Sequence, residues 1–243
     1  MKTIQNNGIQ MSALPSGSPV SARRKPFFMR IILLTSIVFL LPVVALAQGD
    51  RYTKAMMSTL ASSKQAHTLS DYQEVANRFE RIAKAEKQQW TPWYYAAFYN
   101  LVANFSDSVA DRKKAYLDLA QNQIDEGLKV KPGESEFYVL KVMAIYAQLI
   151  VDPMLGMTLM QDANSLLEQG KTLNPGNPRI YLEQAEGVYN MPEQFGGGKL
   201  RALPILQEAM EKFNQFTPAD SIVPDWGKDR CQMMLSEAMK AKQ

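Results

Sequence analysis

The sequence is poor in the residues that build disulfides and metal centres. It contains one cysteine, Cys231, and one histidine, His67. A disulfide within the chain needs two cysteines, so none can form even in an oxidising compartment. With no histidine or cysteine cluster, zinc, haem, and Cys-His or Ser-His-Asp chemistry that involves more than this one imidazole are excluded or very poorly supported. We therefore predict no metal site, no cofactor and no catalytic residues.

Acidic residues are absent from the first 47 positions, which carry five basic residues. An uncharged apolar run of 17 residues, 31–47, follows the basic stretch and ends in Ala-Leu-Ala. This pattern is typical of a secretory signal peptide cleaved near Ala47. We interpret 1–47 as a signal peptide with an N-terminal extension, in which Met29 is an alternative start, and expect an exported protein, periplasmic or extracellular. An uncleaved membrane anchor is the competing interpretation, because the run is at the short edge of a bilayer span.

Without this segment the chain is no longer basic. The remaining 196 residues carry 22 lysines and arginines against 24 aspartates and glutamates, a formal net charge of −2. Nucleic-acid binding needs a clustered basic surface, so we expect no nucleic-acid partner, and membrane contact only through the signal segment before cleavage. The length suits a single domain, which we place at 48–243.

Strand patterns are lacking, and almost every stretch after the signal has helical spacing. Apolar residues recur at steps of three and four, as at Tyr72, Val75 and Phe79. Helices that are apolar on nearly all sides are expected at 93–105, 137–149 and 180–190. They alternate with helices that have one apolar stripe, formed by Ala115, Leu119, Ile124 and Leu128, by Met160, Ala163, Leu166 and Leu167, and by Leu206, Ala209, Met210 and Phe213.

Turn and cap residues separate these helices. Ser70-Asp71 predicts the N-cap of a helix at 71–86, and proline in 131–134 and 174–178 predicts compact turns. A one-sided helix at 226–239 follows the last turn, with Cys231 on its apolar side as a small buried residue. These patterns predict an all-α array of antiparallel helix pairs with a C-terminal capping helix.

Three of the expected helices end at a fixed interval. Pro132, Pro175 and Pro218 are 43 residues apart. Each has an apolar residue eight positions before it: Ile124, Leu167 and Met210. Self-similarity at a period of about 20 to 50 residues indicates a repeat array in which each unit packs on the next.

The repeat resembles the tetratricopeptide repeat (TPR) family. The motif of that family's second helix is matched by Ala120-x3-Ile124-x7-Pro132 and again one period later. The aromatic residue near the start of its first helix is matched by Tyr138 and Tyr181, each six residues after a proline. Units of 43 residues exceed the usual 34 of the family, so the array is TPR-like with longer helices and loops.

This resemblance covers roughly residues 70–215 and implies a TPR-like α-solenoid. In such arrays the first helices of the pairs line a concave groove. The resemblance therefore makes Asn100, Lys141 and Gln184 candidate groove residues. Lys141 is the single cation in the apolar run 137–147, where it either meets an acidic group of a partner or snorkels to water.

The densest aromatic segment is 90–99, which has six aromatic rings in ten residues. Trp93 and Tyr94 belong to it, and with Tyr138 and Tyr181 they are candidate binding residues, because rigid rings offer large contact areas. The competing interpretation is packing in the core between repeats, which rings at helical spacing usually form.

Two further patterns suggest chemistry less strongly. The loop 192–199 places three glycines before Lys199, but it lacks the other residues of a phosphate-binding loop and is interpreted as a flexible connection. Glu183 and Glu186 lie one helical turn apart and could act as acid and base, but a solvated helix face is favoured.

The sequence thus predicts a non-catalytic, exported, TPR-like scaffold. We expect it to bind a protein or peptide partner through the concave groove of its first helices. The alternative is a helical protein that binds a small ligand and serves an envelope transporter or enzyme, which an enclosed aromatic pocket would favour.

Overall fold

The computed structural model describes residues 49–242, so the predicted signal peptide lies outside the described residues. Within 49–242 the regular elements are helices, and no strand occurs there. None of the described helices is long and apolar enough to cross a membrane. Residues 49–63 are helical, and they are followed by α2 (Leu69–Ala85), α3 (Thr91–Ser106), α4 (Ala110–Val130), α5 (Ser135–Val151), α6 (Gly156–Leu173), α7 (Pro178–Asn190), α8 (Lys199–Gln215) and α9 (Lys228–Lys240).

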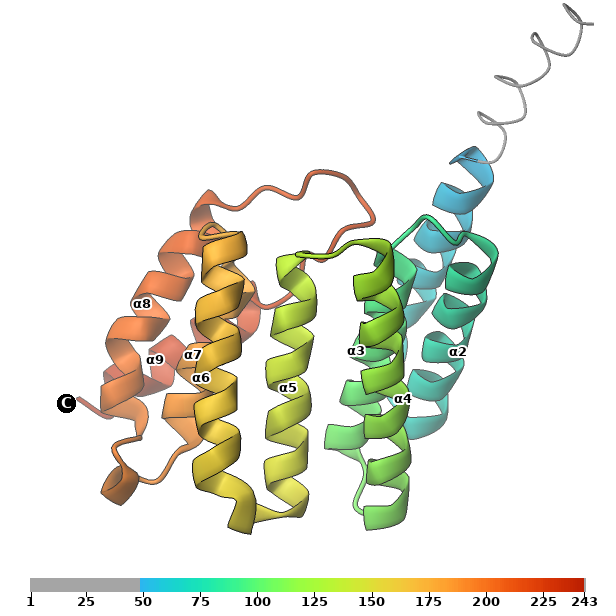
Figure 1. Ribbon diagram of the computed structural model, residues 1–243. Coiled ribbons are helices and arrows are strands. Elements are labelled where there is room, and N and C mark those ends of the chain that lie inside the picture. Colours follow the sequence, from blue (N-terminus) through green and yellow to red (C-terminus); the bar gives the residue numbers. More distant parts are fainter. Residues whose placement is uncertain (1–48, 243) are drawn as a thin grey trace, which may run out of the picture. The chain divides into compact units, whose positions relative to one another are not determined.

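The helices pack as antiparallel neighbours. Each of the pairs α3/α4, α5/α6 and α7/α8 is in extensive contact, and α5 also contacts α3, α4 and α7 (Figure 1). Helix α9 packs against α8 at the end of the series. The predicted all-α array of antiparallel helix pairs with a C-terminal capping helix is confirmed.

The ends of the helices follow local chemistry. Thr68, rather than Ser70 as predicted, is the N-cap of α2: its side chain accepts a hydrogen bond from the Asp71 N–H, and Asp71 accepts in return from the Thr68 N–H. This reciprocal capping box satisfies backbone donors that a helix start otherwise leaves unpaired. Asn177 caps α7 in a similar way, and Pro178 follows at the first helical position.

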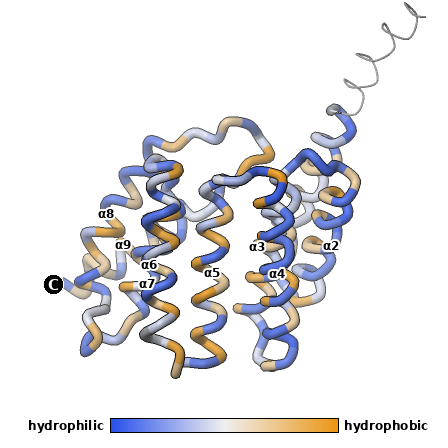
Figure 2. The backbone as a smooth tube through the Cα atoms, in the orientation of Figure 1, coloured by the Kyte–Doolittle hydropathy of each residue, from blue (hydrophilic) through white to orange (hydrophobic). Residues whose placement is uncertain are grey.

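Helix α5 is buried on most sides and runs through the middle of the array. Its fully buried residues include Phe137, Val139 and Leu140. Figure 2 shows hydrophobic residues along the whole of α5, whereas hydrophilic residues recur along α4 and α6. The predicted distinction between enclosed first helices and one-sided second helices is therefore correct for these pairs.

The predicted buried stripe of α4 is partly wrong. Leu119 is 45% exposed, and the helix instead buries Tyr116, Leu117 and Ala120 beside Ile124. The prediction failed because the buried face of α4 also includes polar side chains, which form hydrogen bonds with α3 and with the connection that follows α3. Among these polar residues are Lys113 and Gln123.

Close approach between successive pairs depends on a glycine in α4 and another in α6. A Cβ atom on Gly127 of α4 would overlap the Phe137 ring of α5. One period later, a Cβ on Gly170 of α6 would lie 2.8 Å from Cδ1 of Ile180 in α7. The 43-residue interval therefore repeats a packing contact as well as the turn prolines.

Candidate functional site

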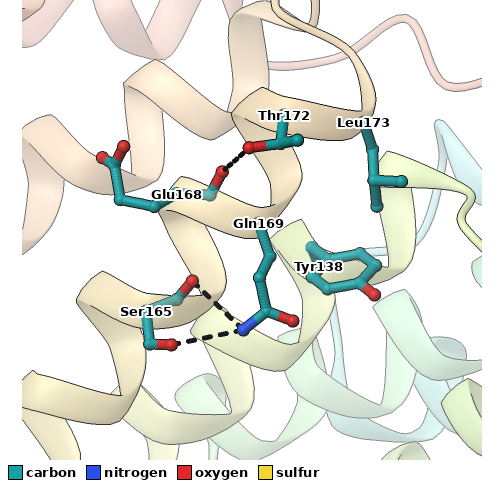
Figure 3. A pocket seen from close by; sticks show the side chains of 6 residues that line it. All are labelled: Tyr138, Ser165, Glu168, Gln169, Thr172 and Leu173. Carbon is teal, nitrogen blue, oxygen red and sulfur yellow. Dashed lines mark hydrogen bonds between the residues drawn. The ribbon is translucent and has the colours of Figure 1, made fainter.

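Two open pockets of about 450 Å³ and 300 Å³ lie along α5. We call them together the α5 trough. The larger is lined by Tyr138 of α5 and by Ser165, Glu168, Gln169, Thr172 and Leu173 of α6 (Figure 3). The smaller is lined by Gln121, Ile124 and Asp125 of α4, Lys141, Ala144, Ile145 and Gln148 of α5, and Leu166 of α6.

Helical periodicity explains why these α5 residues share the trough. Tyr138, Lys141, Ile145 and Gln148 are spaced by three or four positions, so they follow one face of the helix. That face lies between α4 and α6 (Figure 1). The trough is thus flanked by second helices and is not the groove of first helices that the TPR resemblance implied for Tyr138 and Lys141.

Lys141 lines the smaller pocket and contacts Tyr138, which lines the larger one. Its Nζ atom lies 5.7 Å from the centroid of the Tyr138 ring, within the range of a cation–π contact. Within 49–242 no carboxylate forms an ion pair with Lys141, although Asp125 lines the same pocket. The Tyr138 hydroxyl likewise has no hydrogen-bond partner in this part of the chain. The trough therefore presents two half-buried residues whose ammonium and hydroxyl groups are both available to a ligand.

The α6 side of the larger pocket is polar. Gln169 lies between Ser165 and the Tyr138 ring, and Leu173 lies next to that ring (Figure 3). The Gln169 amide donates to the Ser165 carbonyl at 3.3 Å and to its hydroxyl at 3.2 Å. The sequence analysis missed these residues, although Ser165, Gln169 and Thr172 occur at helical spacing and mark a polar strip on α6.

Tyr181 and Gln184 lie on α7, outside the trough. Tyr181 is 7% exposed, and its ring has Lys171 Nζ at 5.5 Å and Lys212 Nζ at 5.2 Å. Its hydroxyl donates to the Pro175 carbonyl at 3.1 Å. Gln184 is half-buried.

Tyr94 and Asn100 are interior residues. The Tyr94 side chain is fully buried, and its hydroxyl accepts a hydrogen bond of 2.7 Å from the Trp226 indole N–H. Asn100 donates to the Gln123 side chain at 2.8 Å. Trp93 is half-buried at the start of α3. The aromatic segment thus serves largely as core, in agreement with the competing interpretation given above.

The chain's own segment 216–227 covers part of the first helices. The Trp226 ring lies 5.0 Å from the Phe98 ring of α3, and Arg179 of α7 donates to the Trp226 carbonyl at 3.3 Å. Arg179 also forms a buried ion pair with Glu136 of α5, with hydrogen bonds of 2.6 to 3.0 Å. This segment occupies surface that a groove partner of the first helices would need.

The prediction that Glu183 and Glu186 form a solvated helix face is wrong. Glu183 is 3% exposed, and Glu186 is 9% exposed and ion-paired with Arg230 of α9. Burial raises the pKa of the Glu183 carboxyl well above its usual range, the charge of Glu186 raises that pKa further, and Arg230 opposes the shift. The sequence of α7 could not show that α9, which is distant in sequence, reaches this face, where Arg230 binds Glu186 and Glu237 accepts a hydrogen bond from Tyr189. Neither carboxylate lines the trough.

The loop 192–199 is an interhelical connection, as predicted. The backbone N–H groups of its three glycines donate to carbonyls of Glu193, Pro192 and Val188 at 2.9 to 3.2 Å. Lys199 is bound to Glu237 at 2.9 Å. Both the amides and the ammonium group that a phosphate would need are therefore engaged.

Metal ligands do not gather in the described part of the chain. No group of three or more His, Cys, Asp or Glu side chains there could hold a metal ion. His67 is exposed in the connection before α2, and Cys231 is buried beneath α8, where its thiol contacts the Leu206 carbonyl at 3.6 Å. These two side chains lie on different elements and do not share a pocket.

Comparison with known proteins finds a similarity among solved structures. No protein-family profile matches the chain, and no curated protein sequence matches it. Among solved structures, the HusA haemophore from Porphyromonas gingivalis is similar, with a TM-score of 0.70 and 26% sequence identity. The similarity covers 79% of this chain and 94% of that one. The likeness thus extends over nearly all of a helical protein whose description is that of a haemophore.

Proposed function

We propose that this chain is an exported helical protein that binds a small planar ligand of the porphyrin class, with haem as the first candidate. The observation that carries the proposal is the similarity to the HusA haemophore over 94% of that protein. At 26% identity the likeness includes sequence as well as fold. The small-ligand alternative is therefore favoured over the scaffold for protein partners, and the function remains one of binding, without catalysis.

The size and character of the α5 trough are compatible with such a ligand. Its pockets of about 450 and 300 Å³ fall within the range of about 300 to 1,000 Å³ that is typical of small-molecule sites. Apolar side chains of Ile124, Ile145 and Leu166 lie beside polar groups. A flat ring system with acidic substituents needs both kinds of surface.

The residues of the trough also limit how haem would be held. Proteins hold haem iron through His, Cys, Met or Tyr side chains. Among the described residues that line the two trough pockets, Tyr138 is the one of these types. A carried haem can also make most of its contacts through the faces and carboxylates of the porphyrin ring. The scarcity of histidine and cysteine in the chain is thus compatible with haem as a carried ligand.

The opposite face of the array offers less to a protein partner. Segment 216–227 already lies on α3 and α7 through Trp226 and Arg179. A peptide in the predicted groove of first helices would have to displace these contacts, and the free energy that they contribute would be lost from its binding.

Titration of residues 48–243 with haem tests the proposal. We expect a saturable shift of the haem Soret band and quenching of tryptophan fluorescence, with the chain unfolded in urea as the control for adsorption. Iron-free porphyrin should also quench, since the ring supplies most of the contact. If neither ligand gives saturable signals up to its solubility limit, the proposed function is wrong.

A further inference from the structure

The three first helices carry a tyrosine at the same repeat position. Tyr95, Tyr138 and Tyr181 are separated by 43 residues, one in each of α3, α5 and α7. Two of them are closed off. The Tyr95 ring is 6% exposed and stacks on Phe79 of α2 at 5.0 Å.

Tyr181 is closed by lysines from the two flanking second helices. Lys171 and Lys212 lie over its ring, and its hydroxyl is bonded to the Pro175 carbonyl. Tyr138 differs in each respect. It has a cation contact only with Lys141, it lines a pocket, and its hydroxyl has no partner within 49–242.

We propose that Tyr138 and Lys141 form a recognition site in the α5 trough for the ring face and a carboxylate of a planar acidic ligand. This inference rests on the proposed function and assigns it a place in the fold and a ligand chemistry. The ring lies along α5 against Tyr138, and the carboxylate meets the Lys141 ammonium group.

The electrostatics of Lys141 favour this arrangement. No carboxylate of the described residues pairs with the Lys141 ammonium group, so the chain itself leaves this positive charge uncompensated. A ligand carboxylate supplies that pair, and charge-assisted hydrogen bonds are stronger than neutral ones. The cation–π contact holds the ammonium group near the Tyr138 ring, so one ligand reaches both side chains.

The neighbours of Lys141 set the orientation of the ligand. Gln121 and Gln148 line the same pocket, and their amides can donate to the carboxylate. Asp125 also lines this pocket, and its negative charge disfavours a second carboxylate there. A ligand with several acidic groups therefore places one at Lys141 and directs the others towards solvent.

The apolar wall of the trough accepts the ring. Ile124, Ala144, Ile145 and Leu166 surround the Lys141 pocket, and Leu173 lies beside Tyr138. Burial of such surfaces against a flat ring contributes roughly 25 cal/mol for each Å² removed from water.

Paired probes separate the carboxylate contribution from the ring contribution. The probes are deuteroporphyrin IX, which carries free propionates, and its dimethyl ester, and binding is followed by tryptophan quenching. For the Lys141→Gln variant we expect affinity for the free acid to fall by about tenfold, since a charged hydrogen bond is lost. We expect the ester to bind the unaltered protein more weakly than the free acid does, and its affinity should not change in the variant. Tyr138→Leu should weaken both probes, because it removes the ring contact.

Lys212→Gln is the matched control. Lys212 also lies over a tyrosine ring, at 5.2 Å, but it does not line the trough. We expect it to bind both probes as the unaltered protein does, and thermal unfolding of all variants checks that they are folded. If Lys141→Gln binds the free acid as tightly as the unaltered protein, or loses equal affinity for acid and ester, the recognition site is wrong although the proposed function stands. If the unaltered protein binds no porphyrin, both fail.

Discussion

Glu183 should make the stability of this protein fall as the pH rises. Its carboxyl is buried on α7, one turn from Glu186, and no described side chain donates a hydrogen bond to it. Arg230 of α9 is bound to Glu186, and Tyr146 of α5 donates to the Glu183 backbone carbonyl at 2.9 Å. The surroundings therefore favour the protonated form of Glu183.

The sign of the pH dependence follows from proton binding. Because burial, aided by Glu186, raises the pKa of Glu183 in the folded protein, the folded state holds a proton that the unfolded chain has released. Stability is then full below the unfolded pKa, about 4.3 for glutamate, and is lost as the pH rises towards the folded pKa. One such proton gives a slope of up to about 1.4 kcal/mol per pH unit in the free energy of unfolding.

Urea unfolding of the unaltered protein and of Glu183→Gln between pH 5 and pH 7 measures this slope. Glutamine keeps the shape and cannot ionise, so the variant should gain up to about 1.4 kcal/mol relative to the unaltered protein between pH 5 and pH 6. Glu183→Leu is the control for packing, because its curve should be offset from that of Glu183→Gln but parallel to it. Since Glu183 and Glu186 interact, the slope belongs to the pair. Parallel curves for the unaltered protein and Glu183→Gln would refute the reasoning.

Two further pairs of substitutions test the packing of the repeat. Gly127→Ala places a methyl group against the Phe137 ring and should destabilise the fold by about 1 to 3 kcal/mol. The control Gly156→Ala, which has open space at its Cβ, should be neutral or stabilising by up to about 1 kcal/mol. Urea unfolding compares the two variants, and equal effects would contradict the proposed contact. Arg179→Met leaves Glu136 buried without its ion-pair partner and should lower the free energy of unfolding by about 3 to 5 kcal/mol. Adding Glu136→Leu should restore much of this stability. A double variant that is no more stable than Arg179→Met in urea unfolding would contradict this reasoning.

The helices could be predicted because their signals are local. Proline stops, capping residues and three-to-four spacing lie within each segment, so the pairs and the capping helix emerged from the sequence. The 43-residue interval also contained a pattern of glycines that was not used in the prediction. Gly127 precedes Phe137 by the same ten positions as Gly170 precedes Ile180, and both pairs are packing contacts.

Buried polar residues were the part that the sequence could not place. Arg179 is 1% exposed because its partner Glu136 lies 43 residues earlier, on another helix. Glu186 is 9% exposed and is ion-paired with Arg230, which lies 44 residues later on α9. A charge pattern within one helix cannot reveal either event, since both depend on which distant element covers the face.

The candidate site contains two of the residues that the sequence singled out. Lys141 was singled out by its isolation in an apolar run, and Tyr138 by its repeat position. Their companions on α4 and α6 could not be assigned, because the resemblance to TPR arrays directed attention to neighbouring first helices. The polar strip of Ser165, Gln169 and Thr172 becomes meaningful only once α6 is known to face Tyr138.

The position of the trough follows from how a repeat array closes its ends. Terminal units of such arrays must be covered, because no further repeat buries their faces. Here α2 covers α3 on one side, where Phe79 stacks on Tyr95, and α9 packs on α7 and α8 on the other, through Arg230 and Cys231. The middle first helix, α5, has only repeat neighbours, and neither covering element reaches the face that carries Tyr138. A ligand site in the middle pair therefore needs no surface that the ends of the array require for stability, and substitutions in the trough should change binding more than they change the unfolding free energy.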